Sequence, residues 1–261
     1  MSIPIVLTAF GTTAKAFETY DRMDEIFRER FKDHPLIWAF SSRMVKDRIK
    51  KNRQRDISDP LEVLDSLNTR GCEWAVVQSL HLICGHEFYR LVAQAGQSPV
   101  RTSMGLPLLT SAEDYMETSD VLAPLIPPSK EEAVVFVGHG TDHPAWTSYP
   151  GLEQILRKKY GNNVFSGVVE GYPEMEATID RIQQNGFKHI TLVPFMLVAG
   201  VHFKEDLTEE EDSWKKTFEK NNITVSIVDH GIGQIKGITE IFCRHIKEAL
   251  DVIPDNTGSH P

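Results

Sequence analysis

The chain of 261 residues is long enough for one large domain, or for two half-size domains that each bury a core. Its 41% hydrophobic and 25% charged residues are typical of a globular protein, and the net charge of -9 argues against a general nucleic-acid binder. No apolar run approaches the roughly 18 residues of a membrane span, and the N-terminus lacks the basic region of a signal peptide.

Strands and helices alternate in the first half of the chain. The residue pattern predicts strands over residues 3–9, 36–40, 72–83 and 100–106, with helices between them. Asp59 is the expected N-cap of one of these helices, Pro60 its first residue and Gly71 the residue that ends it.

The same order of elements recurs in the second half. The turn at Gly11 recurs at Gly140, at an offset of 129 residues, and Gly85 recurs at Gly200, at an offset of 115. The smaller offset indicates an insertion in the first half, near residues 43–59. The sequence is therefore interpreted as an internal duplication.

The duplication predicts an α/β fold of two similar Rossmann-like halves with parallel sheets, residues 1–125 and 126–261. In the second half, Pro173 is expected to open a helix. A last strand and a last helix, near residues 223–228 and 235–250, are expected to complete this half.

The stretch over residues 189–206 carries the most informative strand. Its near-continuous apolar run predicts a strand buried on both faces, as in a parallel sheet covered by helices. Pro194 is expected at a bulge or an edge, and Gly200 is expected to end the strand just before His202. Thr208, followed by four acidic residues, predicts the N-terminus of the next helix through a capping box.

Three candidate metal ligands follow strands of the second half: His139, Glu170 and His202. Because the carboxyl ends of parallel strands meet at one edge of a sheet, we expect these side chains to converge. Two imidazoles and a carboxylate suit Co(II), Fe(II), Ni(II) or Zn(II), and leave coordination positions open. His86 and His143 flank this site and are weaker candidates. The cysteines form no CxxC pair, which argues against a structural zinc site and favours a reducing cytoplasm.

The equivalent positions of the first half are Phe10, Ser41 and Glu87. That half is therefore expected to keep the architecture without the metal ligands. Glu87 is the one residue of the three that can act as an acid or a base.

The insertion near residues 43–59 is strongly basic. Among its cations are Arg43, Lys46 and Arg48, in a chain that is acidic as a whole. Two interpretations stay open: a solvated helix face, or a surface that holds a polycarboxylate ligand.

The order of these motifs resembles the anaerobic-pathway sirohydrochlorin cobaltochelatases, which are class II, ATP-independent tetrapyrrole chelatases with a ferrochelatase-like fold. The resemblance spans nearly the whole chain and is carried by Gln78-Ser-Leu-His81, Gly138-His-Gly140, Glu170-x-Tyr-Pro173, Met196-Leu-Val-Ala-Gly200-x-His202 and Asp212-Ser-Trp214. It implies a tetrapyrrole cleft between two similar α/β domains, and Co(II) insertion into sirohydrochlorin or its reduced precursor without a nucleotide. The metal-binding residues of the family fall on His139, Glu170 and His202.

The resemblance also implies how the remaining candidates act. Phe10, Ser41 and the cations of the insertion are expected to contact the macrocycle. Glu87, together with His139 or Glu170, is expected to accept the two pyrrole protons.

Other functions use the same ligands. A carrier of metal or tetrapyrrole would bind without turnover, and a ferrochelatase would supply sirohaem instead of cobalamin. A metal-dependent hydrolase would activate water at the open position, although the sequence has no nucleophile elbow or P-loop. We expect a cytoplasmic protein with no nucleic-acid or membrane partner. The sequence leaves open whether it forms a homo-oligomer.

Overall fold

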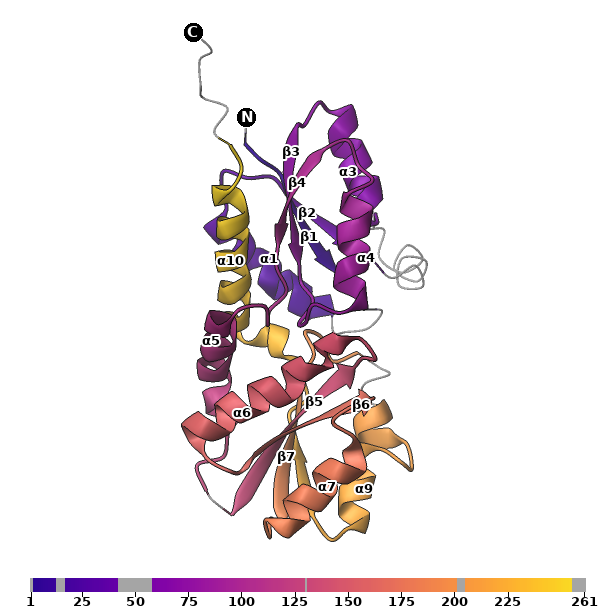
Figure 1. The fold of residues 1–261 in the computed structure, drawn as a ribbon, viewed down its shortest axis with the longest axis vertical. Coiled ribbons are helices and arrows are strands. Elements are labelled where there is room, and N and C mark those ends of the chain that lie inside the picture. Colours follow the sequence, from indigo (N-terminus) through magenta and orange to yellow (C-terminus); the bar gives the residue numbers. More distant parts are fainter. Residues whose placement is uncertain (1, 13–16, 42–57, 130, 201–204, 255–261) are drawn as a thin grey trace. The chain divides into compact units, whose positions relative to one another are not determined.

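The computed structural model describes residues 2–12, 17–41, 58–129, 131–200 and 205–254 (Figure 1). These residues form two compact units. Met1–Gly11, Asp24–Leu108 and Thr239–Pro261 make up the first unit, and Thr12–Met23 with Leu109–Ile238 make up the second. None of the described helices is long and apolar enough to cross a membrane.

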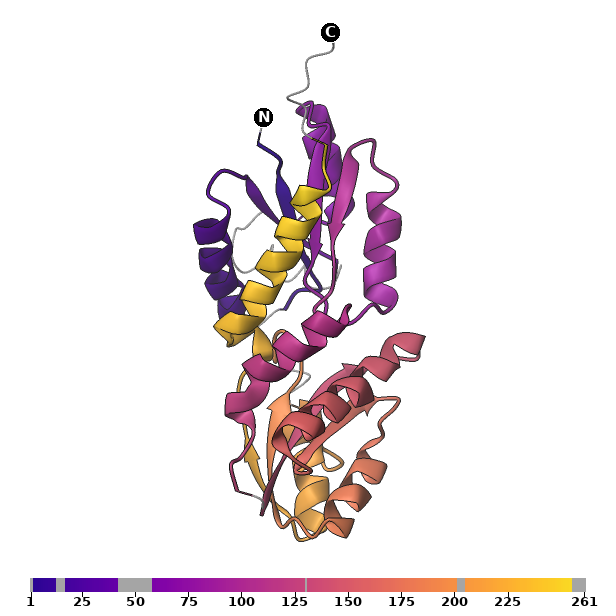
Figure 2. The same ribbon diagram turned by 60° about the vertical axis from the view of Figure 1, so that its left-hand side comes forward.

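The first unit is built on a four-stranded parallel sheet with the order β2-β1-β3-β4. The strands are β1 (Ile5–Ala9), β2 (Leu36–Phe40), β3 (Trp74–Ser79) and β4 (Arg101–Gly105). Figures 1 and 2 show helices on both faces of this sheet: α3 (Pro60–Thr69) and α4 (His86–Ala95) on one, α1 (Glu18–Arg30) and α10 (Lys236–Asp251) on the other.

Local sequence signals position these helices. The Asp59 side chain accepts from the Glu62 N–H at 3.0 Å, and the Glu62 carboxylate accepts from the Asp59 N–H at 2.8 Å. This capping box confirms Asp59 as the N-cap and Pro60 as the first helical residue. The buried face of α3 then packs Leu64 and Leu67 against the sheet.

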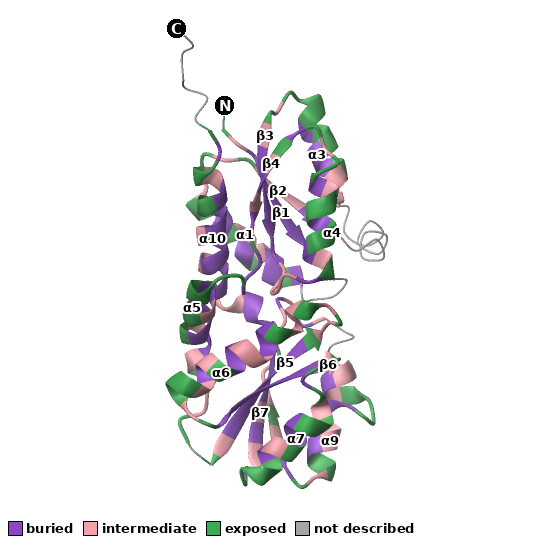
Figure 3. Cartoon of the chain, viewed as in Figure 1, coloured by how far each residue is buried: buried purple, intermediate pink, exposed green. Residues whose placement is uncertain are grey.

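The second unit repeats the arrangement with the order β6-β5-β7-β8, again all parallel. Its strands are β5 (Glu132–Gly140), β6 (Val164–Glu170), β7 (His189–Pro194) and β8 (Thr224–Ile227). Its α-helices include α5 (Ala112–Leu122), α6 (Ser148–Tyr160), α7 (Met175–Gln184) and α9 (Trp214–Lys220). In Figure 3 the strands of both units are mostly buried, whereas the outer faces of the helices are exposed.

Register and backbone geometry confirm the duplication. Ile5 pairs with Val76 in the first sheet, and the residues at the same offsets, Val134 and Thr191, pair in the second. The turn after each first strand contains a glycine with positive φ, 103° at Gly11 and 93° at Gly140. The expected α/β fold with two Rossmann-like halves is therefore confirmed.

The last helix does not stay with the second half. From Thr239 onward α10 belongs to the first unit, where the ring of His245 bonds through Nδ1 to the Leu106 carbonyl at 2.9 Å. On the same helix, Glu240 forms an ion pair with Arg30 at 2.9 Å. The expectation that this helix completes the second half is wrong, because its buried face covers the sheet of the first unit.

The expected place of Pro194 is also wrong. Strand β7 lies between β5 and β8, so it is neither an edge strand nor interrupted by a bulge. Pro194 is its last residue, and the N–H of Phe195 makes the next hydrogen bond, to the Val137 carbonyl at 2.8 Å. The strand therefore ends at Pro194 and not at Gly200.

Two helix starts differ from expectation. Pro173 does not open α7, because its carbonyl accepts from the Val168 N–H at 3.1 Å and α7 starts after Glu174. Thr208 does not cap a helix either: it lies in a single π turn (Glu205–Glu209), and α9 begins later, after Ser213. The three cysteines are free, and burial raises the pKa of the Cys243 thiol to about 12.

Candidate metal site

His139 lies at the carboxyl end of β5 and is exposed to solvent. The glycines on either side of it have no room for a side chain. A Cβ at Gly138 would lie 2.3 Å from the Tyr149 ring, and a Cβ at Gly140 would lie 1.7 Å from the Glu170 carbonyl oxygen. The Gly-His-Gly sequence therefore lets the backbone around His139 approach both α6 and β6 closely.

Glu170 is the last residue of β6 and is also exposed. It pairs in register with Gly140, the residue after His139. The structure thus places two of the three expected ligands at the carboxyl ends of neighbouring parallel strands. Beyond Glu170, the ring of Tyr172 is 53% exposed and packs edge-on against Trp146, with a centroid distance of 5.1 Å.

The third expected ligand, His202, lies outside the described residues. It follows β7, which is the other neighbour of β5. Among the residues that are described, no group of three or more His, Cys, Asp or Glu side chains could hold a metal ion. The metal triad therefore stays a prediction.

A partly open hollow of about 170 Å³ lies at the same edge of the second sheet. Its lining combines Pro194 at the end of β7 and Asp229 just after β8 with residues of the intervening segment: Ala199, Leu207, Thr208, Ile227 and Val228. The hollow is mostly apolar, and among the described residues of its lining Asp229 is the charged one.

His143 is engaged elsewhere. Its Nδ1 accepts from the Ala145 N–H at 3.1 Å and caps the short helix Pro144–Thr147. His86, the other weaker candidate, is exposed as the first residue of α4. Histidines expected to be structural make local hydrogen bonds, as His34 does to the Ile3 carbonyl at 2.8 Å.

In the first unit the structure brings two predicted site residues together. The Ser41 hydroxyl lies 3.5 Å from Oε2 of Glu87, and Arg90 holds the other carboxylate oxygen at 2.9 Å. The Glu87 side chain is 30% exposed, in the first turn of α4. Phe10 follows β1 and is 52% exposed. Arg43, Lys46 and Arg48, like the rest of residues 42–57, lie outside the described residues.

Sequence reasoning missed Tyr149, a buried residue of α6 whose hydroxyl accepts from the Gly140 N–H at 3.2 Å. Burial raises the pKa of this phenol, and the hydrogen bond from Gly140 lowers it in part, so the group is neutral near pH 7. The glycines around His139 were the available signal in the sequence, because they indicate that another residue packs closely against this backbone. They do not identify that residue.

A second polar group was noted only as part of a motif. His81, just after β3, bonds through Nδ1 to the Ser79 hydroxyl at 2.8 Å. Burial lowers the pKa of His81 to about 4, so its ring is neutral. Within the described part of the chain, its buried Nε2 atom has no hydrogen-bond partner.

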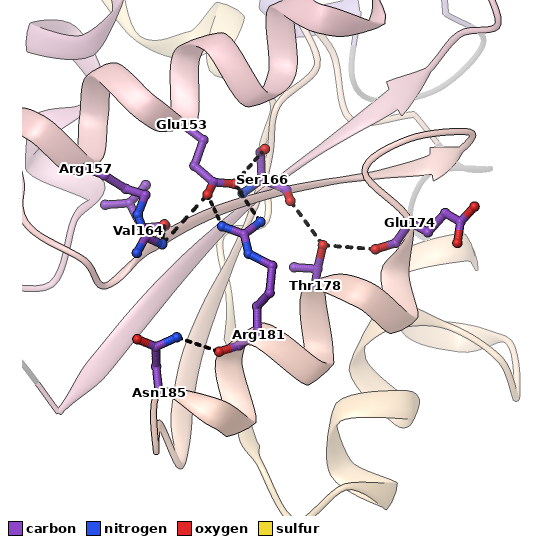
Figure 4. A network of polar contacts seen from close by, with 8 residues as sticks. All are labelled: Glu153, Arg157, Val164, Ser166, Glu174, Thr178, Arg181 and Asn185. Atoms are coloured by element: carbon purple, nitrogen blue, oxygen red, sulfur yellow. Dashed lines mark hydrogen bonds and ion pairs between the residues drawn. The ribbon is translucent and has the colours of Figure 1, made fainter.

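In the second unit, the buried carboxylate of Glu153 ties α6, β6 and α7 together through hydrogen bonds and a part-buried ion pair (Figure 4). The Glu153 carboxylate accepts from the Ser166 N–H at 2.8 Å and from its hydroxyl at 3.0 Å, and pairs with Arg181. Arg157 lies 3.7 Å from the same carboxylate. The guanidinium groups of Arg157 and Arg181 both lie over the Phe165 ring, 5.1 and 5.2 Å from its centroid.

Replacing Glu153 by alanine is expected to lower the free energy of unfolding by about 2–4 kcal/mol. The change leaves the Ser166 N–H without its acceptor and places two cations near each other without their anion. Urea unfolding would measure the loss, with Glu176→Ala, an exposed residue of α7, as the control. A loss no larger than that of the control would contradict a stabilising role for the network.

Comparison with solved structures supports the fold. SirB from Bacillus subtilis with Fe3+ has a TM-score of 0.67 at 16% identity, covering 95% of this chain and 96% of that one. The sirohydrochlorin chelatase SirB from Bacillus subtilis subspecies spizizenii, in complex with cobalt, has a TM-score of 0.62 at 16% identity and covers 96% of both chains.

Sequence comparison identifies nearer relatives. The sirohydrochlorin cobaltochelatase of Salmonella typhimurium is 35% identical over 229 residues, 84% of this chain and 85% of that protein. The sirohydrochlorin cobaltochelatase CbiKC of Nitratidesulfovibrio vulgaris is 32% identical over 260 residues, 96% and 92% of the two chains. Residues 4–251 match the sequence model of the family described as cobalt chelatase (CbiK). The resemblance carried by the five motifs is thereby confirmed, and the chain belongs to the cobalt chelatase (CbiK) family.

Proposed function

We propose that this protein inserts Co(II) into sirohydrochlorin, or into its reduced precursor, without a nucleotide, as a step of cobalamin biosynthesis in the cytoplasm. The observation that carries the proposal is the family match over residues 4–251, with two relatives named sirohydrochlorin cobaltochelatase at 32–35% identity. The placement of His139 and Glu170 at neighbouring strand ends supports it further, since two ligands of one metal ion have to lie close together.

Co(II) is here a substrate, and His139, Glu170 and His202 are its proposed ligands. Two neutral imidazoles and one carboxylate bind a borderline divalent cation well enough to take it from water. Three protein ligands also leave positions at which pyrrole nitrogens can replace water. This site can therefore pass the metal on to the macrocycle.

Insertion releases two protons, because each of the two pyrrole N–H groups loses its proton when its nitrogen binds the metal. Glu87 in the first unit is proposed to accept one of them, and His139 or Glu170 the other. A carboxylate that is 30% exposed, as Glu87 is, can return its proton to water between turnovers.

The test is a visible spectrum of sirohydrochlorin with Co(II), recorded with and without the protein at a concentration far below that of the substrates. Conversion of many macrocycles per protein molecule is the expected result. Binding that saturates at one equivalent would indicate a carrier instead, and faster conversion with Fe(II) than with Co(II) would favour sirohaem supply.

The basic segment is proposed to bind the carboxylates of the macrocycle. Neutralising Arg43, Lys46 and Arg48 together should raise KM for sirohydrochlorin about tenfold or more, since a charge-assisted contact contributes roughly 1.5–3 kcal/mol where shielded and less where exposed. The dependence of KM on salt should weaken as well. The affinity for Co(II) should not change.

The matched control neutralises three exposed cations elsewhere in the chain: Arg70, Lys158 and Lys188. This variant carries the same change in net charge, and its KM should stay close to that of the wild type. If the two triple variants raise KM equally, the effect comes from the net charge of the protein. The basic segment is then a solvated surface that does not bind the macrocycle.

A further inference from the structure

We propose that Tyr149 is a positioning residue for His139: its hydroxyl fixes the Gly138–Gly140 backbone, and thereby the direction in which the imidazole meets the metal. The inference rests on the proposed function, in which His139 is a metal ligand. It adds a residue that touches neither the metal nor the macrocycle.

Tyr149 contacts the backbone on both sides of His139. Its ring lies so close to Gly138 that a Cβ there would be 2.3 Å from Cε1. Its hydroxyl accepts from the Gly140 N–H at 3.2 Å. The residue before His139 and the residue after it are therefore both held by one side chain, which is 5% exposed.

Gly140 is also held by β6. It pairs in register with Glu170, and its α-carbon lies so close to that residue that a Cβ would be 1.7 Å from the carbonyl oxygen. A glycine at φ 93° has few steric limits of its own, so its conformation is set by these contacts. The Tyr149 hydroxyl therefore bonds to the residue whose conformation sets the distance between His139 and Glu170.

Tyr149 itself has a firm support. Its ring packs edge-on against Phe195, with a centroid distance of 6.4 Å, and the Phe195 N–H donates to the Val137 carbonyl of β5 at 2.8 Å. One turn further along α6, Glu153 joins the helix to β6 and α7 (Figure 4). The phenol is thus fixed to the same sheet whose strand ends it orients.

The experiment is a titration of Co(II) into the metal-free full-length protein, followed by the ligand-field absorption of the bound ion. In Tyr149→Phe, the Kd for Co(II) should rise about tenfold and the absorption should shift, because loss of a group that orients a metal ligand typically costs 10–100-fold in affinity. Insertion should slow by a similar factor, with KM for sirohydrochlorin unchanged. Tyr149→Phe keeps the ring contacts, so thermal unfolding should show that the variant is folded at the titration temperature.

Tyr160→Phe is the matched control. Tyr160 lies on the same helix, and its hydroxyl also makes a hydrogen bond, donated to Asp120 at 2.8 Å, but it is far along α6 from Gly140. The control should bind Co(II) as the wild type does. Tyr149→Leu, which removes the ring as well, should bind no better than Tyr149→Phe.

The outcomes separate this inference from the function on which it rests. If Tyr149→Phe binds Co(II) with the affinity and spectrum of the wild type while His139→Ala has lost binding, Tyr149 has only a packing role and the inference is overturned. The inference is also overturned if Tyr149→Leu loses affinity for Co(II) while Tyr149→Phe keeps all of it. If His139→Ala itself binds Co(II) normally, the proposed metal site is wrong.

Discussion

His139→Ala and His202→Ala are each expected to lower the rate of Co(II) insertion by about 10²-fold or more, because losing a direct ligand should cost at least as much as losing a group that merely orients one. Stability should hardly change in His139→Ala, since His139 is exposed at a strand end and its removal leaves no internal cavity. The measurements are the absorbance change on metal insertion and the midpoint of thermal unfolding.

His189→Ala provides the control for this pair. His189 is the first residue of β7, at the amino end of the strand, where its ring bonds to the Thr224 hydroxyl at 2.8 Å. Its removal should leave insertion intact. Near-normal turnover in His139→Ala or in His202→Ala would remove that histidine from the mechanism.

Glu87→Ala is expected to slow insertion on the order of 10²-fold while changing the Kd for Co(II) by no more than a few-fold, as for a general base that is not a ligand. Glu87 lies in the first turn of α4, where the helix dipole favours a carboxylate, and it contacts Ser41 and Arg90. The two quantities would be measured separately, by single-turnover insertion and by Co(II) titration.

Arg90→Ala distinguishes a base from a structural anion at this position. Arg90→Ala removes the ion pair at 2.9 Å and leaves the Glu87 carboxylate in place. If Glu87 acts as a base, Arg90→Ala should keep most of the insertion rate that Glu87→Ala loses. If Glu87 only anchors α4, both variants should lose stability. Full turnover in Glu87→Ala would confine the chemistry to the second unit.

The sequence was informative wherever a signal is local. The capping box at Asp59 depends on neighbours three residues apart, and the recurrence of Gly11 at Gly140 depends on a backbone shape that few residues other than glycine adopt. For the same reason, the ends of β5 and β6 could be predicted together with His139 and Glu170.

Sequence signals gave wrong predictions, or none, where contacts between residues far apart in the chain determine the structure. Pro194 was expected at a bulge or an edge because its nitrogen cannot donate a hydrogen bond. At the last position of a central strand, however, no ladder bond is lost if the next residue donates instead. Thr208 carried a capping pattern, but the chain forms a π turn there and starts α9 later. Tyr149 could not be found at all, because its contact with Gly140 requires the folded position of α6.

The return of α10 to the first unit has a consequence for synthesis on the ribosome. The second unit is complete once Ile238 has emerged, whereas the first unit, although it begins at the N-terminus, still lacks residues 239–261. Its contact between Leu106 and His245 joins residues 139 positions apart. Such distant contacts form late, so the duplicated half that is made first should be the one that folds last.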